Sequence, residues 1–154
     1  MTDTMSATVR QLDSNDITLL RAMLDVFGAA FDEAETYTAA QPDDTYLRDL
    51  LHGSSFIAVV AMDGNEVIGG LAAYELRKFE QQRSEVYIYD LAVLSERRRQ
   101  GVATALIGEL KRIASGRGAH VIFVQADYVD PPAIALYAKL GRREEVLHFD
   151  IDVE

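Results

Sequence analysis

The sequence predicts an α/β (α+β) fold with a single mixed, mostly antiparallel sheet flanked by helices on both faces, built by one domain over residues 1–154. Three observations predict this fold. The length of 154 residues is that of about one domain and allows a sizeable core. The hydrophobic fraction of 49% and the charged fraction of 26% are ordinary for a globular chain. Strand-like and helix-like patterns follow one another in the order β-α-α-β-β-β-α-β-α-β, without a linker or an internal repeat.

The first half of the chain supplies a strand, two helices and a β-hairpin. Apolar residues from Ile17 to Phe31 recur at a spacing near 3.6, which is typical of an amphipathic helix. The turn Asp63-Gly64-Asn65 lies between two apolar runs and indicates a hairpin. The predicted segments are a strand Thr8–Leu12, a helix Ile17–Phe31, an acidic loop Asp32–Gln41, a short helix from Asp43 or Asp44 to Leu51, and strands Phe56–Ala61 and Val67–Tyr74.

The second half of the chain supplies three strands and two helices. The pair Asp130-Pro131 is typical of a helix N-cap followed by its first turn, and Gly141 is a typical helix end. The predicted segments are a polar connection Leu76–Arg83, a long strand Glu85–Val93, a helix Gly101–Ala114, a strand His120–Gln125, a helix Ala133–Leu140 and a final strand Glu145–Ile151.

The composition excludes several classes of protein. With 15 basic and 25 acidic residues, a net charge of −10 is unsuited to binding nucleic acid, and it favours cationic ligands. The chain has no cysteine, and its three histidines are dispersed, so we expect no metal site and no cysteine nucleophile. No apolar run approaches the ~18 residues of a membrane span, and the first residues lack a secretion-signal pattern. We therefore expect a cytoplasmic protein.

The charge is unevenly distributed along the chain. The region from Asp25 to Leu50 holds seven acidic residues and one base, whereas the region from Glu96 to Arg117 holds six bases and two acids. One region therefore suits cations and the other suits anions. Two solvated faces of opposite sign would produce the same pattern.

The basic region includes a turn between a predicted strand and a predicted helix. A helix start presents backbone N–H groups that lack intrahelical partners, together with the positive end of the helix dipole. Gly101 and Ala103 are small enough for an anion to approach the backbone, and Arg98 adds positive charge. The pattern Arg98-x-x-Gly101-x-Ala103 directly after a long strand therefore predicts an anion site, although a purely structural helix start would have similar residues.

These residues resemble a known family. Arg98-x-x-Gly101-x-Ala103, following Asp90-Leu91-Ala92-Val93, resembles the pyrophosphate-binding motif of the GNAT superfamily of acetyltransferases. The segment from Asp130 through Leu136-Tyr137 to Gly141 resembles the second coenzyme A segment of that superfamily. The chain from Leu19 to Asp152 also resembles the aminoglycoside 3-N-acetyltransferases of the gentamicin-resistance type. The segments that carry this closer resemblance are Phe79-Glu80-Gln81, Ser84–Val93, Val124–Tyr128 and His148–Asp152.

Asp90 breaks the pattern of its own strand. By strict alternation, Val86, Ile88, Asp90 and Ala92 share one face, so a carboxylate occupies an apolar position. Burying an unpaired carboxylate is costly, and such exceptions mark functional sites. A structural reading, with Asp90 paired to a core arginine or at a bulge, stays open. The resemblance implies that Asp90 receives the substrate amine, either orienting it or also accepting its proton.

The resemblance also implies roles for other residues. Tyr137 would protonate the departing thiolate of coenzyme A, and the backbone of Leu91 and Val93 would bind pantetheine and the thioester oxygen. The residues implied in binding acetyl-CoA are Leu91, Ala92, Val93, Arg98, Arg99, Gln100, Gly101, Val102, Ala103, Thr104 and Asp130. The candidate residues for the polycationic acceptor are Asp90, Asp127, Tyr128, Asp150, Glu80 and Glu35.

We therefore expect an enzyme that transfers acetyl from acetyl-CoA to an amine of an aminoglycoside, the 3-amino group by resemblance, through direct attack in a ternary complex. Its partners would be the aminoglycoside and coenzyme A. We expect it to bind neither nucleic acid nor a membrane, and it could form a homodimer. Two alternatives remain. The acceptor could be a polyamine or a protein amine, or the chain could be a catalytically silent domain that binds coenzyme A.

Overall fold

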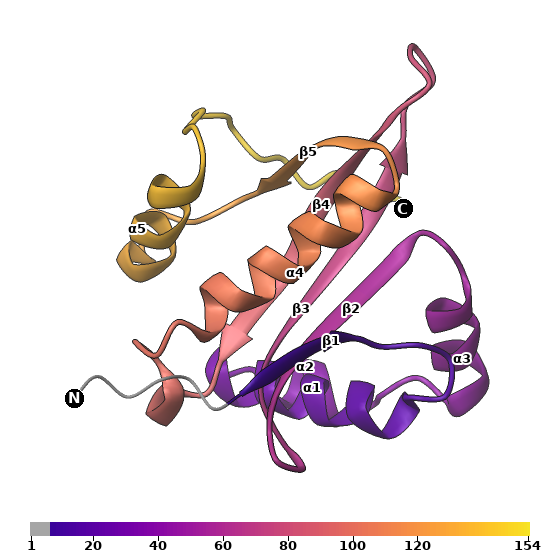
Figure 1. Cartoon of the computed structure of the whole chain (residues 1–154), viewed down its shortest axis with the longest axis vertical. Helices are drawn as coiled ribbons and strands as arrows, with labels where there is room; N and C mark the ends of the chain where they lie inside the picture. The colour runs from indigo at the N-terminus through magenta and orange to yellow at the C-terminus, as the bar shows by residue number, and fades with distance from the viewer. Residues whose placement is uncertain (1–6) are drawn as a thin grey trace.

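The computed structural model describes residues 7–154; residues 1–6, which the predicted domain includes, lie outside the described part. Its helices and strands surround one five-stranded sheet (Figure 1). In chain order the elements are β1 (Thr8–Gln11), α1 (Ile17–Ala30), α2 (Ala34–Thr38), α3 (Asp44–His52), β2 (Phe56–Asp63), β3 (Glu66–Arg77), β4 (Ser84–Val93), the 3-10 turn η1 (Ser95–Arg97), α4 (Val102–Gly116), β5 (Ala119–Val124) and α5 (Pro131–Leu140).

The strands lie in sequence order, β1-β2-β3-β4-β5. The first four pair antiparallel with their neighbours, and β5 pairs parallel with β4 after the crossover through α4. The predicted hairpin between β2 and β3 is present, and Gly64 in its turn has a φ of +61°. The predicted mixed, mostly antiparallel sheet is confirmed.

The sheet separates two cores. The α4-side core packs Val59, Leu71 and Val86 of the sheet against Leu106 and Leu110 of α4. The α1-side core packs the opposite face of the same strands against α1 and α3. Figure 1 shows α4 lying along the strands β3 and β4, with α1, α2 and α3 gathered together away from it. Helices on both faces bury β2 from Phe56 to Ala61, which explains its continuous apolar sequence.

A close approach of α1 to the sheet depends on one glycine. A Cβ built at Gly70 of β3 would lie 2.4 Å from Cγ and 2.6 Å from Sδ of Met23. Met23 is itself 1% exposed, so its side chain lies directly on the glycine backbone. This contact sets how near α1 lies to β3 and β4.

A β-bulge in β4 overturns one expectation. Ala72 of β3 pairs with Asp90, whereas the next residue, Ala73, pairs with Ile88, so Tyr89 is an extra residue on β4. An extra residue reverses the alternation that follows it. Val86 and Ile88 face the α4-side core, but Ala92 faces the α1-side core. Asp90 therefore does not share a face with Val86 and Ile88, as strict alternation predicted.

Two predicted segments also differ from the structure. The predicted acidic loop Asp32–Gln41 contains the helix α2, since five residues are too few for a clear periodicity. The predicted final strand Glu145–Ile151 does not form: residues 142–154 make no helix or strand and are exposed. An alternating pattern shows that a segment can form a strand, but the strand forms only where a neighbouring edge accepts it.

Candidate active site

The second half of β4 has one open side. β5 pairs with β4 only from Ser84 to Ile88 and then diverges, whereas β3 pairs with β4 as far as Val93. Leu94 N–H donates to Ile68 of β3, so by the antiparallel alternation Leu91 and Val93 point their backbone groups away from β3. The carbonyl oxygen of Val93 accepts a hydrogen bond from Nε of Arg98 at 3.2 Å. A polar stretch of backbone therefore faces the gap between β4 and β5.

The turn between β4 and α4 has the geometry of an anion site. Arg99 and Gly101 have left-handed φ values of 64° and 81°, and open space surrounds the position of a Cβ on Gly101 among the described atoms. In the described chain no side chain caps the first turn of α4, so its backbone N–H groups remain available. Arg97 is engaged elsewhere, with Asp63 at 2.6 Å. These features suit a negatively charged group, as the sequence predicted for this turn.

Asp90 lies on the α1 side of β4, half-buried, where Tyr37 of α2 donates its hydroxyl to Oδ2 at 3.2 Å. Burial raises the pKa of the Asp90 carboxyl above its ordinary value; the Tyr37 hydrogen bond opposes this and the charge of Glu33 adds to it. Burial, together with the charge of Asp90, likewise raises the pKa of the Tyr37 phenol far above its ordinary value. The phenol therefore stays protonated and acts as a donor to the carboxylate.

An apolar hollow of about 220 Å³ lies beside Asp90. Its walls come from α1, α3 and the strands β2, β3 and β4, with Met23, Tyr74 and Tyr89 among the lining residues. The Asp90 carboxylate is the one acidic group among the lining residues of this hollow. The arrangement therefore provides a site for a molecule that carries both carbon surface and positive charge.

Tyr137 of α5 lies on the other side of the sheet. Its ring is half-buried and packs, with the side chain of Leu136, against the α4-side core, to which Leu91 and Ala103 also contribute. Burial, with a contribution from the charge of Asp130, raises the pKa of Tyr137 to about 12. The phenol is thus protonated at neutral pH and can donate a hydrogen bond to a neighbouring group that becomes negatively charged.

The comparison with known families identifies the family of this chain. The model of the acetyltransferase (GNAT) family matches residues 20–141. This chain belongs to the GNAT family of acetyltransferases. Members of this family use acetyl-CoA, and the turn at the start of α4 fits its pyrophosphate.

Solved structures and curated proteins are similar to this chain. An aminoglycoside acetyltransferase, HMB0005, from an uncultured soil metagenomic sample is 58% identical, with a TM-score of 0.96, and the match covers 97% of this chain and 100% of that one. A second, meta-AAC0020, from a similar sample and in complex with sisomicin, is 31% identical with a TM-score of 0.88; the match covers 96% and 97%. N-acetyltransferase 8B of Rattus norvegicus is 26% identical over 73% of this chain, which spans 56% of that protein's length.

Within the GNAT fold, the remaining predicted residues lie in different places. Asp130 caps α5 by accepting a hydrogen bond from Ala133 N–H at 3.3 Å, and Asp127 lies in the exposed connection before it. Tyr128 donates its hydroxyl to Glu145. The contacts predicted for Asp130 with acetyl-CoA, and for Asp127 and Tyr128 with the acceptor, remain predictions.

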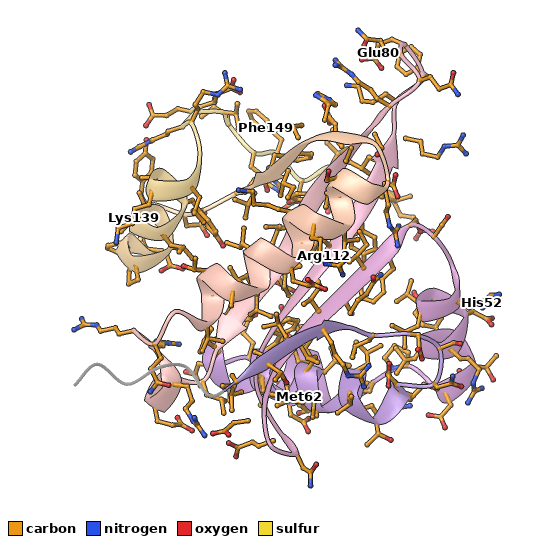
Figure 2. The ribbon with its side chains drawn as sticks, viewed as in Figure 1. His52, Met62, Glu80, Arg112, Lys139 and Phe149 are labelled. Atoms are coloured by element: carbon orange, nitrogen blue, oxygen red, sulfur yellow. The ribbon has the colours of Figure 1, made fainter. Side chains whose placement is uncertain are left out.

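The acidic residues predicted to bind the acceptor do not gather around Asp90 as one group. Figure 2 shows Glu80 at the far tip of the hairpin between β3 and β4, where it pairs with Lys78 at 2.9 Å. Asp150 lies on the exposed C-terminal segment and contacts His148 at 2.9 Å. Glu35, in contrast, lies on α2, two residues before Tyr37.

Two residues that act on Asp90 were not predicted from the sequence. Tyr37 contacts the carboxylate directly, and the charge of Glu33 raises its pKa. Both lie in the segment that was predicted to be a loop. Tyr37 and Asp90 are 53 residues apart in the chain, and the cluster of acidic residues around α2 was the one signal that pointed to this region.

In residues 7–154, no three side chains of His, Asp or Glu lie close enough together to hold a metal ion. The helices of this part of the chain include none with the length and apolar character needed to traverse a bilayer.

Proposed function

We propose that this GNAT acetyltransferase transfers the acetyl group of acetyl-CoA to an amino group of an aminoglycoside such as gentamicin. The observation that carries the proposal is the position of Asp90: a half-buried carboxylate beside an apolar hollow and next to the open backbone of β4. The 58% identity to a protein named as an aminoglycoside acetyltransferase supports the class of acceptor. The net charge of −10 is suited to a substrate that carries several ammonium groups.

Asp90 is equipped to bind an ammonium group. In residues 7–154, the side chain that hydrogen-bonds to Asp90 is that of Tyr37, and no cation contributes to its pKa shift. The second carboxylate oxygen, Oδ1, is then available to a substrate. A charge-assisted hydrogen bond to a partly buried cation stabilises the complex by about 1.5–3 kcal/mol.

The proposed transfer uses three sets of groups from this chain. Asp90 orients the amine so that its nitrogen attacks the thioester carbon. The backbone groups on the open side of β4, at Leu91 and Val93, face the developing negative charge on the carbonyl oxygen. As the new C–N bond forms and the C–S bond breaks, the amine loses a proton and the thiolate gains one from Tyr137, which recovers its own from solvent.

The amine proton has two possible acceptors. Water in the exposed mouth of the hollow is one. Asp90 itself is the other, and its raised pKa makes it a better base than an ordinary aspartate. We favour orientation by Asp90 with loss of the proton to water, and a pH profile of Asp90→Asn distinguishes the two routes.

The preferred amine is proposed to be the 3-amino group. This part of the proposal is supported by the resemblance of segments Ser84–Val93 and His148–Asp152 to the 3-N-acetylating enzymes. NMR of the acetylated gentamicin product tests this regiochemistry, because acetylation at a different amine would change the chemical shifts of different ring protons. A product acetylated elsewhere would contradict the regiochemistry and leave the proposed acceptor class intact.

The decisive experiment compares Asp90→Asn with the parent enzyme. We expect kcat/KM for gentamicin to fall roughly 10- to 100-fold from binding alone, with an unchanged Kd for acetyl-CoA by calorimetry. A matched control is Asp49→Asn, which neutralises an exposed carboxylate on α3 and should keep parental kinetics. Near-parental turnover by Asp90→Asn between pH 6 and 9 would overturn the proposal.

The class of acceptor is tested with a panel of amines. Gentamicin, spermidine and a lysine-containing peptide are each offered with acetyl-CoA to the parent enzyme. The proposal is supported if gentamicin is acetylated with the highest kcat/KM of the three amines. Preference for spermidine or the peptide would point to a different GNAT acceptor, and tight acetyl-CoA binding without turnover would indicate a silent domain.

A further inference from the structure

The helix α2 carries Tyr37 and has little stability of its own. It spans the five residues Ala34–Thr38, and none of them is fully buried. Isolated helices shorter than about 12–15 residues are marginal in water, so contacts with the rest of the chain must hold α2 in place. The position of the Tyr37 hydroxyl at Asp90 therefore depends on what fastens α2.

One fastening lies at the N-terminal end of α2. A Cβ built at Gly28 of α1 would lie 3.2 Å from Cα of Ala34 and 3.5 Å from Cβ of Tyr37, so the two helix backbones are in contact. The Glu33 N–H donates to the Gly28 carbonyl oxygen at 2.9 Å. This contact sets the distance between α1 and the start of α2, but one point of contact does not fix an orientation.

A second fastening lies beyond the C-terminal end of α2. Arg21 of α1 donates from Nη1 to Oε1 of Gln41 at 2.8 Å. Its Nη2 donates to the Pro42 carbonyl oxygen at 3.0 Å and to Oδ1 of Asp44 at 2.6 Å. One guanidinium thus holds the connection from α2 to α3 at three places. The planar set of donors on arginine suits this task, whereas a lysine offers a single nitrogen.

Gln41 links Arg21 to α2. Its Nε2 donates to the Tyr37 carbonyl oxygen at 3.1 Å, while its Oε1 accepts from Arg21. This orientation of the amide satisfies both partners, because the oxygen faces a donor and the nitrogen faces an acceptor. The hydroxyl of the same Tyr37 donates to Oδ2 of Asp90 at 3.2 Å. A continuous series of contacts therefore runs from Arg21 through Gln41 and Tyr37 to Asp90.

The two fastenings come from one side of α1. Arg21 and Gly28 are seven residues apart, which is close to two turns of a helix, so α1 contacts the α2 segment at both of its ends. Two points of contact fix an orientation as well as a distance. The rings of Phe27 and Phe31, with centroids 5.9 and 5.7 Å from that of Tyr37, complete the seat of the tyrosine ring.

We propose that Arg21 is a positioning residue for the acceptor site, because through Gln41 it holds α2 in the orientation in which the Tyr37 hydroxyl reaches Asp90. This inference rests on the proposed function, which assigns Asp90 to the acceptor amine. Arg21 acts through the α2 segment and takes no part in the transfer itself.

The hydrogen bond that depends on Arg21 tolerates little movement. At 3.2 Å it is already longer than the usual distance of about 2.5–3.0 Å for an O–H···O bond. A further displacement of about 0.5 Å would take the hydroxyl beyond hydrogen-bond length. Loss of the Arg21 contacts is therefore expected to release Asp90 from Tyr37 even where the rest of the fold is intact.

A double-variant cycle on the free enzyme tests this coupling. The pKa of Asp90 is followed by NMR of protein isotopically labelled at its aspartate carboxyls, with Asp90→Asn identifying the signal. In the parent, Tyr37→Phe should raise this pKa by about one pH unit, because it removes a hydrogen bond that favours the ionised form. In Arg21→Gln, Tyr37→Phe should change it by no more than about 0.3 pH unit, since the bond is already lost.

The comparison is made within each background for a physical reason. Displacing α2 would also change the burial of Asp90 and the influence of the charge of Glu33, both of which raise its pKa. The absolute pKa in Arg21→Gln therefore combines opposing effects. The change that Tyr37→Phe causes within that background reports the hydrogen bond alone.

Arg48→Gln is the matched control. Arg48 lines the same surface hollow as Arg21 and carries the same charge, but the contacts with Gln41, Pro42 and Asp44 described above belong to Arg21. In Arg48→Gln, Tyr37→Phe should still raise the pKa of Asp90 by about one pH unit. A second variant, Gln41→Met, breaks the middle link and should behave as Arg21→Gln does, so the test does not depend on the folding of one variant.

The outcomes separate this inference from the proposed function. A full effect of Tyr37→Phe in folded Arg21→Gln or Gln41→Met would overturn the positioning role, and so would the lack of any effect in the parent. The titration uses no acceptor. An enzyme that shows the loss of coupling but acetylates no aminoglycoside would contradict the proposed acceptor and support the role of Arg21 in positioning Tyr37.

Discussion

Replacing Tyr37 with phenylalanine isolates one hydrogen bond at the candidate site. Tyr37 donates to Oδ2 of Asp90 at 3.2 Å, while its ring packs on Phe27 and Phe31 with centroid distances of 5.9 and 5.7 Å. Tyr37→Phe keeps the ring and these contacts. It removes the donor that stabilises the ionised carboxylate.

The magnitude follows from the geometry. A hydrogen bond to a charged group contributes about 1.5–3 kcal/mol, and the length of 3.2 Å places this bond near the lower limit. Losing about 1.5 kcal/mol corresponds to about a tenfold change in an equilibrium or rate. Because the bond favours the ionised form, its loss raises the pKa of Asp90 beyond the rise that burial already causes. Activity that needs the carboxylate then requires a higher pH.

The assay is the pH dependence of kcat/KM for gentamicin. We expect the acidic limb of the Tyr37→Phe profile to move to higher pH, with about a tenfold loss of kcat/KM on that limb and little loss at pH 9. The control Tyr87→Phe removes a hydroxyl that donates to Gln125 at 2.9 Å, and its acidic limb should keep the parental position. A folded Tyr37→Phe enzyme with an unmoved limb would refute the role of Tyr37.

Three further changes test other parts of the structure. Gly101→Val forces a branched side chain into a φ of +81°, and we expect at least a tenfold weaker Kd for acetyl-CoA by calorimetry, together with a loss of stability of about 1–3 kcal/mol in urea unfolding; an unchanged Kd would remove the turn from the coenzyme site. Tyr137→Phe should lower kcat about 100-fold or more at unchanged Kd for acetyl-CoA, and a parental kcat would show that another group protonates the thiolate. Gly70→Ala places a Cβ 2.4 Å from Met23, so we expect a loss of about 1–3 kcal/mol in unfolding free energy, which Gly108→Ala, with open space around its Cβ among the described atoms, should not show.

Local sequence signals predicted the elements that local physics determines. The hairpin turn at Gly64, the helix that begins after Gly101 and the cap at Asp130 each depend on residues within a few positions of one another. The paired strands and the two cores followed because their apolar residues recur at the periods of a strand and a helix. The predicted fold class is therefore confirmed by the structure.

The features that the sequence did not predict depend on contacts between distant segments. Asp90 was selected as an exception to the alternation, but its face was predicted wrongly because the extra residue Tyr89 is visible only in the pairing of β4 with β3. Tyr37 reaches Asp90 across 53 residues of sequence. The pattern Glu145–Ile151 predicted a strand without saying which edge receives it.

The bulge at Tyr89 has a consequence for how this protein can be altered. Substitutions in β4 change a side chain but leave the count of residues between Ile88 and Asp90 intact. Loss of the bulge at constant length, with Tyr89 drawn into the regular pairing with β3, would restore the simple alternation, turn the carboxylate toward the α4-side core and turn apolar residues toward the hollow. Mutational libraries in this strand should therefore preserve the bulge as well as Asp90, because the face that the carboxylate occupies depends on the extra residue being left out of the regular pairing.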